Sequence, residues 1–252
     1  MSTPTVAVLG LGEAGSRIAA DLAAAGVEVT GYDLVERDCA GVARAVDPAS
    51  AVEQADVVLC CTAASAALGA AAAALPGLKA GAVYADLNTA PRELKRELAT
   101  VVGDGFADVA LLGAVPARGL RTPALASGPG ARAFADAFGP LGMPVEVVSG
   151  EPGDAAVLKL VRSVFMKGIA AAALESLAAA ESAGQAEWAR RQLDDAIGEQ
   201  LVERLLDGSH RHAARRVEEM QAACELLVSL GVEPRVAAAS RDVLAGLARG
   251  DA

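Results

Sequence analysis

The stretch of the chain that most constrains its fold is residues 7–33, AVLGLGEAGSRIAADLAAAGVEVTGYD. A short apolar run at 5–9 ends in glycine, and apolar residues then recur on one face of a helical pattern from 14 to 25. A β-branched, alternating run follows at 27–32. This order predicts a strand, a helix and a second strand, which is the unit from which parallel sheets are built.

Three glycines of this stretch follow the pattern Gly-x-Gly-x-x-Gly between the first strand and the helix. Gly10 allows a tight turn out of the strand, Gly12 lets the backbone approach a pyrophosphate, and Gly15 lets the helix pack closely on the sheet. The first N–H groups of the helix point at the same place and favour an anion. We therefore expect a dinucleotide-binding loop formed by Gly10, Leu11, Gly12, Glu13, Ala14 and Gly15.

An acidic residue, Asp33, ends the second predicted strand, eighteen residues beyond Gly15. A carboxylate at this place accepts hydrogen bonds from the ribose hydroxyls of NAD and repels the 2′-phosphate of NADP. Arg37 lies close enough in the sequence to favour the phosphate instead. The sequence thus predicts NAD or NADP as the cofactor, with NAD favoured by Asp33.

Strand and helix patterns continue to alternate as far as residue 148. This alternation predicts an α/β fold with a Rossmann-type doubly wound sheet that has helices on both faces. The further strands are expected at 57–61, 83–86, 106–112, 124–127 and 145–148, and the helices at 63–75, 91–101 and 131–138.

Beyond residue 150 only helical periodicity is found, starting with one long apolar helix at 154–183. We therefore expect a Rossmann domain at 1–150 and an all-helical C-terminal domain at 151–252. About a hundred residues with such an apolar helix form a poor independent domain. A homodimer formed through the C-terminal helices would bury this helix, and packing against the chain's own first domain is the alternative.

The charge balance is 22 basic against 32 acidic residues, which argues against nucleic acid or an anionic membrane as a partner. None of the four cysteines has zinc-site spacing, so no metal is expected and reduced thiols in a cytoplasmic protein are the simplest interpretation. The N-terminus lacks the pattern of a signal peptide. The uncharged run 57–78 is better explained by a buried strand and helix than by a membrane span.

Candidate acid–base chemistry is concentrated on one face of the long helix. Lys159 lies among apolar residues, and partial burial lowers the pKa of a lysine toward the range of an acid–base group. Ser163 follows at i+4 and Lys167 continues the stripe, so both could bind a substrate oxygen. A solvated polar strip is the alternative.

Four segments, VLGLGEAGSRIAADLAAAGVEVTGYD, YADLNTAP, FADVALLGAV and GDAAVLKLVRS, resemble the β-hydroxyacid dehydrogenase superfamily in order and spacing. That superfamily includes 3-hydroxyisobutyrate and 6-phosphogluconate dehydrogenases, and the C-terminal part resembles a branch with a shortened helical domain. The resemblance implies that Lys159 is the catalytic lysine and that Gly113 belongs to the substrate loop. It also implies that the cofactor is lined by Thr62, Ala63, Asn88 and Thr89.

The substrate loop departs from the usual family pattern. Leu112 stands where a serine grips the substrate carboxylate, Ala114 replaces the second glycine, and Ser163 stands where asparagine is usual. The substrate carboxylate is then expected to bind elsewhere, and a partner subunit's helices could contribute to the pocket. The candidates are Arg118, Arg121 and Arg162, and the cluster of His212, Arg215 and Arg216, for which a solvated helical face is the alternative.

These residues predict an NAD(P)-dependent oxidoreductase that transfers hydride between nicotinamide and a small hydroxy or oxo substrate, with a lysine as general acid/base. An imine reductase is one alternative, although a lysine at this position argues against it. A protein that binds NAD(P)H as a sensor without turnover is the other. Decarboxylation coupled to oxidation stays open.

Overall fold

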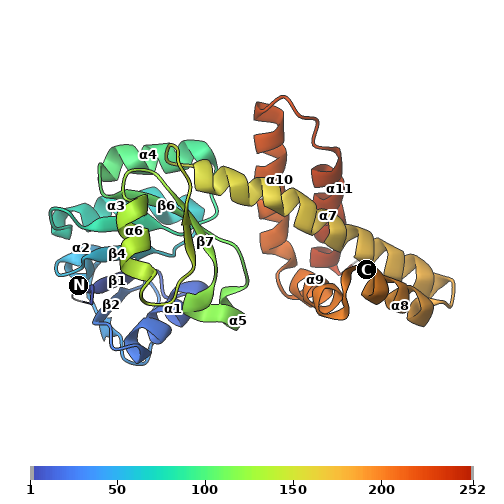
Figure 1. The fold of residues 1–252 in the computed structure, drawn as a ribbon, viewed down its shortest axis with the longest axis horizontal. Coiled ribbons are helices and arrows are strands. Elements are labelled where there is room, and N and C mark those ends of the chain that lie inside the picture. Colours follow the sequence, from blue (N-terminus) through green and yellow to red (C-terminus); the bar gives the residue numbers. More distant parts are fainter. Residues whose placement is uncertain (1–2, 251–252) are drawn as a thin grey trace. The chain divides into compact units, whose positions relative to one another are not determined.

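The computed structural model describes residues 3–250 and divides into two compact units, Met1–Lys159 and Leu160–Ala252 (Figure 1). The first unit is built around one sheet and the second consists of helices. The helix α7, Asp154–Ser182, begins in the first unit and continues into the second.

The first unit contains an eight-stranded sheet in the order β3-β2-β1-β4-β5-β6-β7-β8. Every neighbouring pair is parallel except β6 with β7, which are antiparallel. The predicted doubly wound sheet is thus confirmed. The strands are β1 Val6–Leu9, β2 Val29–Tyr32, β3 Ala43–Arg44, β4 Val57–Cys60, β5 Val83–Asp86, β6 Phe106–Leu111, β7 Ala124–Ser127 and β8 Val145–Val147.

Helices cover both faces of this sheet because alternate strand residues point to opposite sides. On one face, Val8 and Leu59 pack with α1 (Glu13–Ala24) and α6 (Ala131–Phe138). On the other face, Leu9 and Val58 pack with α2 (Pro48–Val52), α3 (Ala67–Ala74) and α4 (Arg92–Val102). The core is largely aliphatic, as a chain with 3% aromatic residues requires.

Four short elements were not predicted from the sequence. The two-residue strand β3 pairs with the edge of the sheet, and α2 is started by a capping box between Asp47 and Ser50. The helix α5 (Val115–Arg118) and the 3₁₀ turn η3 (Gly119–Arg121) follow β6. They are held on α1 because Asp21 accepts a hydrogen bond from the Leu120 backbone at 2.9 Å.

The second unit packs α7 with four further helices: α8 Ala186–Ile197, α9 Glu199–Arg211, α10 Ala213–Ser229 and α11 Arg235–Arg249. Its small core joins Leu160 of α7 to Met220 and Cys224 of α10 and to Leu244 of α11. Among the described residues, no helix has the length and apolar character that crossing a membrane requires.

Candidate functional site

The glycine loop after β1 adopts a backbone that excludes side chains at two positions. Gly10 has φ +94°, and a Cβ atom there would lie 2.7 Å from the carbonyl oxygen of Cys61. A Cβ atom on Gly15 would lie 1.9 Å from the carbonyl oxygen of Gly10. Both glycines are therefore required by the contact of α1 with the loop and with the residue that follows β4, as the sequence pattern predicts.

Gly12 differs from the other two glycines because a Cβ atom there would meet nothing within 4 Å. It is the N-cap residue of α1, and no side chain caps this helix end. The first N–H groups of a helix have no partner within the helix. Open space in front of a helix N-terminus is what a pyrophosphate requires, so the loop fits a dinucleotide. Leu11 is buried, Glu13 is exposed and Ala14 is half-buried beside it.

Asp33 connects the end of β2 to the glycine loop. Its Oδ2 accepts a hydrogen bond from the Leu11 backbone N–H at 2.6 Å, and its Oδ1 accepts one from Val35 at 2.9 Å. The Arg37 Nε lies 3.9 Å from Oδ2. Each carboxylate oxygen keeps acceptor capacity beyond these contacts. The carboxylate thus holds the loop in place and can still bind hydroxyl groups.

The four residues expected to line the cofactor follow β4 and β5, two neighbouring parallel strands. Asn88 is buried, and its Nδ2 lies 3.4 Å from the Thr62 Oγ1. Ala63 and Thr89 are exposed. Because β1 is also parallel to β4, these residues lie at the same sheet edge as the glycine loop. The structure therefore brings the expected cofactor residues together.

Lys159 lies in the second turn of α7 and is half-buried. Its Nζ donates a hydrogen bond to the Thr89 Oγ1 at 2.7 Å. The lysine that the sequence singled out is therefore in contact with the predicted cofactor loop after β5, seventy residues away. A primary amine held at the carboxyl edge of a Rossmann sheet is placed to exchange a proton with a bound small molecule.

A buried ionic cluster lies directly beneath this edge and was missed by the sequence analysis. The Nζ of Lys95 lies 2.6 Å from Asp86 Oδ2 and 2.8 Å from Asp108 Oδ1, and all three side chains are fully buried. Burial lowers the pKa of Lys95, but the two carboxylates outweigh it and raise the pKa above the usual lysine value. The only signal in the sequence is an aspartate within each of two buried strands, in VYAD and FADVAL.

The candidate substrate residues of the first unit lie in the segment after β6. Gly113 is exposed, and a Cβ atom there would make only ordinary contacts, the nearest at 3.5 Å from the Thr122 Cγ2. Arg121 is exposed in η3, and Arg118 precedes it at the end of α5. Since β6 is parallel to β5, the segments after the two strands, which contain Gly113 and Thr89, begin at the same edge of the sheet.

Two candidate substrate residues of the second unit, Ser163 and Lys167, bind Glu219 of α10. The Lys167 Nζ lies 2.9 Å from Glu219 Oε1, to which the Ser163 hydroxyl also donates. Ser163 is buried, and burial lowers the pKa of Lys167 even though Glu219 opposes this. His212 is half-buried between α9 and α10, and Arg216 donates to the Leu205 carbonyl in the middle of α9.

Comparison with known proteins also indicates a dinucleotide-binding domain in the first unit. Residues 5–112 match the family described as the NAD binding domain of 6-phosphogluconate dehydrogenase, and residues 180–247 match a domain of unknown function, DUF1932. A curated relative from Methanothermus fervidus, an uncharacterized 28.5 kDa protein in the 7S RNA 5′ region, is 26% identical over 156 residues. That match spans 60% of this chain and 61% of the relative.

Solved structures resemble the chain over nearly all of its length. A conserved hypothetical protein from Sinorhizobium meliloti is 31% identical, with a TM-score of 0.75, over 97% of this chain and 88% of that protein. The conserved protein MTH1747, described as similar to 3-hydroxyacid dehydrogenases, is 29% identical, with a TM-score of 0.73 and 96% of both chains covered. A 3-hydroxyisobutyrate dehydrogenase from Mycobacterium tuberculosis shares the fold, with a TM-score of 0.82 and 19% identity over 98% and 94% of the two chains.

The glycine loop, the parallel sheet edge and the family match define an NAD(P)-dependent oxidoreductase of the dehydrogenase and reductase class. The match of the helical unit and the similarity to solved structures over nearly the whole chain identify the superfamily within this class. The chain belongs to the β-hydroxyacid dehydrogenase superfamily.

Proposed function

We propose that the protein transfers a hydride between NAD and a small hydroxy or oxo acid, with Lys159 as the general acid/base. The observation that carries this proposal is the hydrogen bond from Lys159 Nζ to Thr89 at the cofactor edge of the sheet. In the oxidation direction, the neutral amine of Lys159 takes the proton from the substrate hydroxyl while the carbon gives up its hydride. Bound NAD supplies the hydride acceptor for this step.

The chain's own residues have separate tasks in this proposal. Gly10, Gly12 and Gly15 hold the pyrophosphate, and Thr89 orients the amine of Lys159 through the contact at 2.7 Å. In this proposal the substrate carboxylate is bound by polar or cationic side chains elsewhere, because Leu112 stands where the family has the serine of the substrate loop. The candidates are the exposed guanidinium of Arg121, the hydrogen-bonded pair of Ser163 and Lys167, and His212.

The preference for NAD is inferred from Asp33. Asp33 is half-buried, and its carboxylate can still accept hydrogen bonds. Such a carboxylate suits the two ribose hydroxyls of NAD and repels the 2′-phosphate of NADP. We expect NADH to bind at least about tenfold more tightly than NADPH, a difference of about 1.4 kcal/mol. Titration of nicotinamide fluorescence with each cofactor measures this preference, and Asp33→Asn should reduce it.

Asp38→Asn is the matched control for this titration because Asp38 is exposed and lies five residues further along the same loop. It should leave the preference unchanged. Tighter binding of NADPH would show that Arg37 decides the preference instead of Asp33. If neither cofactor bound, the proposed function would be wrong. If both bound but no 3-hydroxy acid or oxo acid were turned over, the two alternatives would be an imine reductase and a sensor of NAD(P)H, which turnover of imines distinguishes.

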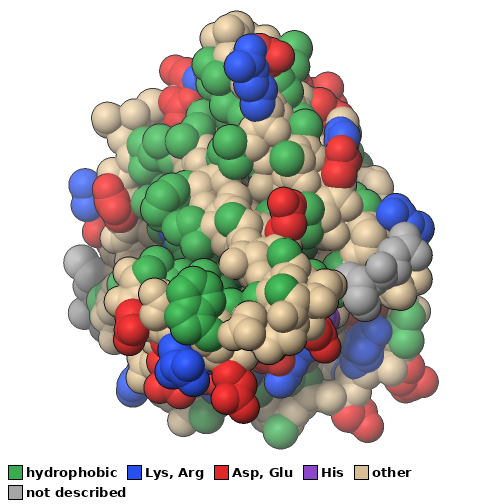
Figure 2. Space-filling view, turned by 90° about the vertical axis from the view of Figure 1, so that its right-hand side faces the viewer, with side chains coloured by type: hydrophobic (Ala, Val, Ile, Leu, Met, Phe, Trp, Pro, Cys, Tyr) green, Lys and Arg blue, Asp and Glu red, His purple; other side chains and the backbone are tan. Residues whose placement is uncertain are grey.

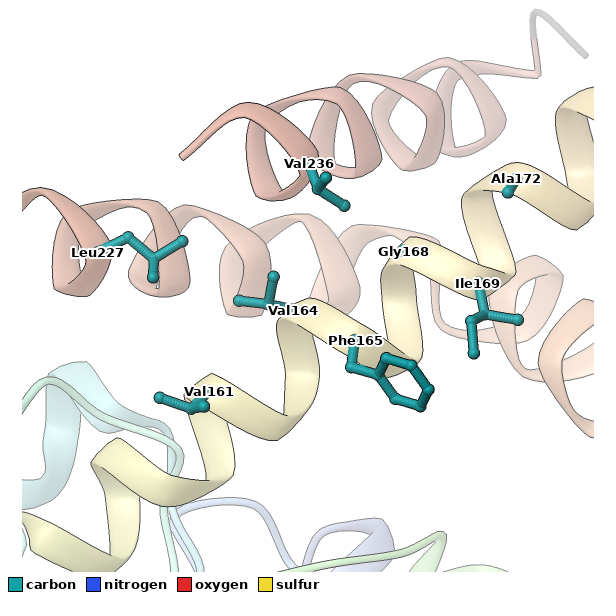
Figure 3. A pocket seen from close by; sticks show the side chains of 8 residues that line it. All are labelled: Val161, Val164, Phe165, Gly168, Ile169, Ala172, Leu227 and Val236. Atoms are coloured by element: carbon teal, nitrogen blue, oxygen red, sulfur yellow. The ribbon is translucent and has the colours of Figure 1, made fainter. Parts of the chain in front are cut away.

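We also propose that the protein is a cytoplasmic homodimer formed through the helical unit. A groove of about 560 Å³ lies along α7 and is lined only by apolar residues and glycine (Figure 3). Val161, Phe165, Ile169 and Ala172 form one stripe of α7, and Phe165 is 66% exposed. Figure 3 shows Phe165 and Ile169 projecting away from Leu227 and Val236, so the unit's own helices leave this stripe uncovered.

Apolar side chains also gather on one face of the molecule. Figure 2 shows hydrophobic side chains over the central part of one face, with most charged side chains toward its margin. A second copy of the chain would cover such surface without placing charges against it. Phe165→Glu should therefore convert a dimer into a monomer in light scattering after size exclusion, whereas Phe165→Leu should not. A monomeric wild-type protein would refute the homodimer.

A further inference from the structure

The first turn of α7 is fastened to the sheet through two side chains. The backbone N–H of Ala155 donates to the Ser127 Oγ at 3.0 Å, and that of Ala156 donates to Asp108 Oδ2 at 3.0 Å. Ser127 and Asp108 are fully buried and lie opposite each other on the antiparallel strands β7 and β6. They satisfy two N–H groups that a helix start otherwise leaves without partners.

The same cluster also holds the loop that Lys159 contacts. Asp108 shares the ammonium of Lys95 with Asp86, and Asp86 Oδ1 accepts a hydrogen bond from Asn88 Nδ2. Asn88 directly precedes Thr89, which is the hydrogen-bond acceptor of Lys159. One buried network therefore fixes both partners of this contact, the helix on one side and the loop on the other.

The charges of the network match this arrangement. One lysine pairs with two carboxylates, so the buried cluster has a net charge of −1. The start of α7 presents the positive end of a helix dipole to Asp108 through the Ala156 N–H. The positive end of the helix dipole therefore compensates part of this negative charge, which favours a start of α7 at this place, one turn before Lys159.

We propose that Ser127 and Asp108 are positioning residues that set the place of Lys159 for proton transfer. The proposal rests on the catalytic role of Lys159 in the proposed function. Both residues act through the backbone of α7. Loss of either contact would loosen the first turn and move the amine from its hydrogen bond with Thr89. Misplacement of a reacting group by about 1 Å costs about a hundredfold in rate.

Ser127→Ala tests the proposal, with Ser240→Ala as the matched control. Ser240 is equally buried, but its hydroxyl donates to the Val236 carbonyl within its own helix, α11. Ser127→Ala should lower kcat for a 3-hydroxy acid that the wild type oxidises, such as 3-hydroxyisobutyrate, by about ten- to a hundredfold, with little change in KM or in NADH binding. Ser127→Thr restores the hydroxyl and should recover most of the rate.

Two further measurements need no substrate. In Ser127→Ala, amide hydrogen exchange in residues 155–159 should become at least about threefold faster, as expected for the loss of one hydrogen bond. The rate and pH profile of acetylation of the Lys159 amine, followed by mass spectrometry, should change as well. Neither should change in Ser240→Ala.

The outcomes separate the positioning role from the proposed function. If the wild type oxidises no 3-hydroxy acid but exchange and acetylation change, the network still fixes Lys159 and the proposed function fails. If Lys159→Ala abolishes turnover while Ser127→Ala and Asp108→Asn retain wild-type kcat, exchange and acetylation, the positioning role is wrong. A fall in NADH binding equal to the fall in kcat would also overturn it, since general damage to the fold would explain both.

Discussion

Replacement of Lys159 by alanine is expected to abolish turnover and to spare cofactor binding. Loss of a positioned general acid/base costs about 10²- to 10⁴-fold in rate. The side chain contacts Thr89 at the edge of the site, whereas the glycine loop is held by its own backbone packing and by Asp33. Steady-state rates with a panel of 3-hydroxy acids, together with NADH titration, measure both effects on the same variant.

Lys79→Ala is the control for this result. Lys79 is also a lysine of the first unit with a hydrogen-bonded partner, Asp56 at 2.8 Å, but it follows the helical segment before β5, away from the carboxyl edge. It should retain wild-type turnover. If Lys159→Ala turned over substrate at the wild-type rate, the general acid/base would have to be another residue. If it lost NADH binding as well, Lys159 would be a cofactor ligand.

The second large effect is expected at Lys95. Lys95→Met keeps the length and apolar stem of the side chain but leaves Asp86 and Asp108 buried without their shared cation. Removal of one partner from a buried ion pair costs about 3–5 kcal/mol in the free energy of unfolding. Urea denaturation followed by circular dichroism measures this loss. Arg96→Met, on the exposed neighbour of Lys95 in α4, should change the stability by less than about 0.5 kcal/mol.

The decrease in the free energy of unfolding caused by Lys95→Met should also depend on pH. Burial and the proximity of a second carboxylate raise the pKa of an aspartate in the folded variant above its value in the unfolded chain. The folded variant then binds more protons than the unfolded chain, so its stability increases as the pH falls through the raised pKa. The difference from the wild type should therefore be smaller at pH 5 than at pH 8. A difference independent of pH would show that lost packing, and not charge, is responsible.

The cofactor half of the site could be predicted from the sequence because its signals are local. Gly10 is required by the positive φ of the turn after β1, and Gly15 by its contact with Gly10 in the same turn. The alternating patterns place the following loops at one sheet edge. The catalytic role of Lys159 was inferred differently. The residues alone left a solvated polar strip as the alternative, and the resemblance to a family supplied the assignment; the contact with Thr89 was not predicted.

The buried network could not be predicted because its members owe their roles to partners far away in the sequence. Lys95 occupies one position in the charged pattern RELKREL, and nothing local distinguishes it from the exposed Arg96. Its burial follows from Asp86 and Asp108, which only strand pairing brings together. The partner of Lys167 is likewise far away in the sequence, because Glu219 belongs to α10 and Lys167 to α7. The sequence therefore predicted the polar stripe of Lys159, Ser163 and Lys167 but not the carboxylate that binds the last two of them.

The continuity of α7 restricts how this chain can change during evolution. Proteins usually exchange, lengthen or shorten their parts at flexible joints, but here the two units meet inside a helix, between Lys159 and Leu160. One inserted residue at this place would turn every later side chain of α7 by about 100° relative to the preceding ones. Insertions and recombination are therefore expected to be tolerated before Asp154 or after Ser182, while the spacing from Lys159 to Ser163 is inherited as a fixed length.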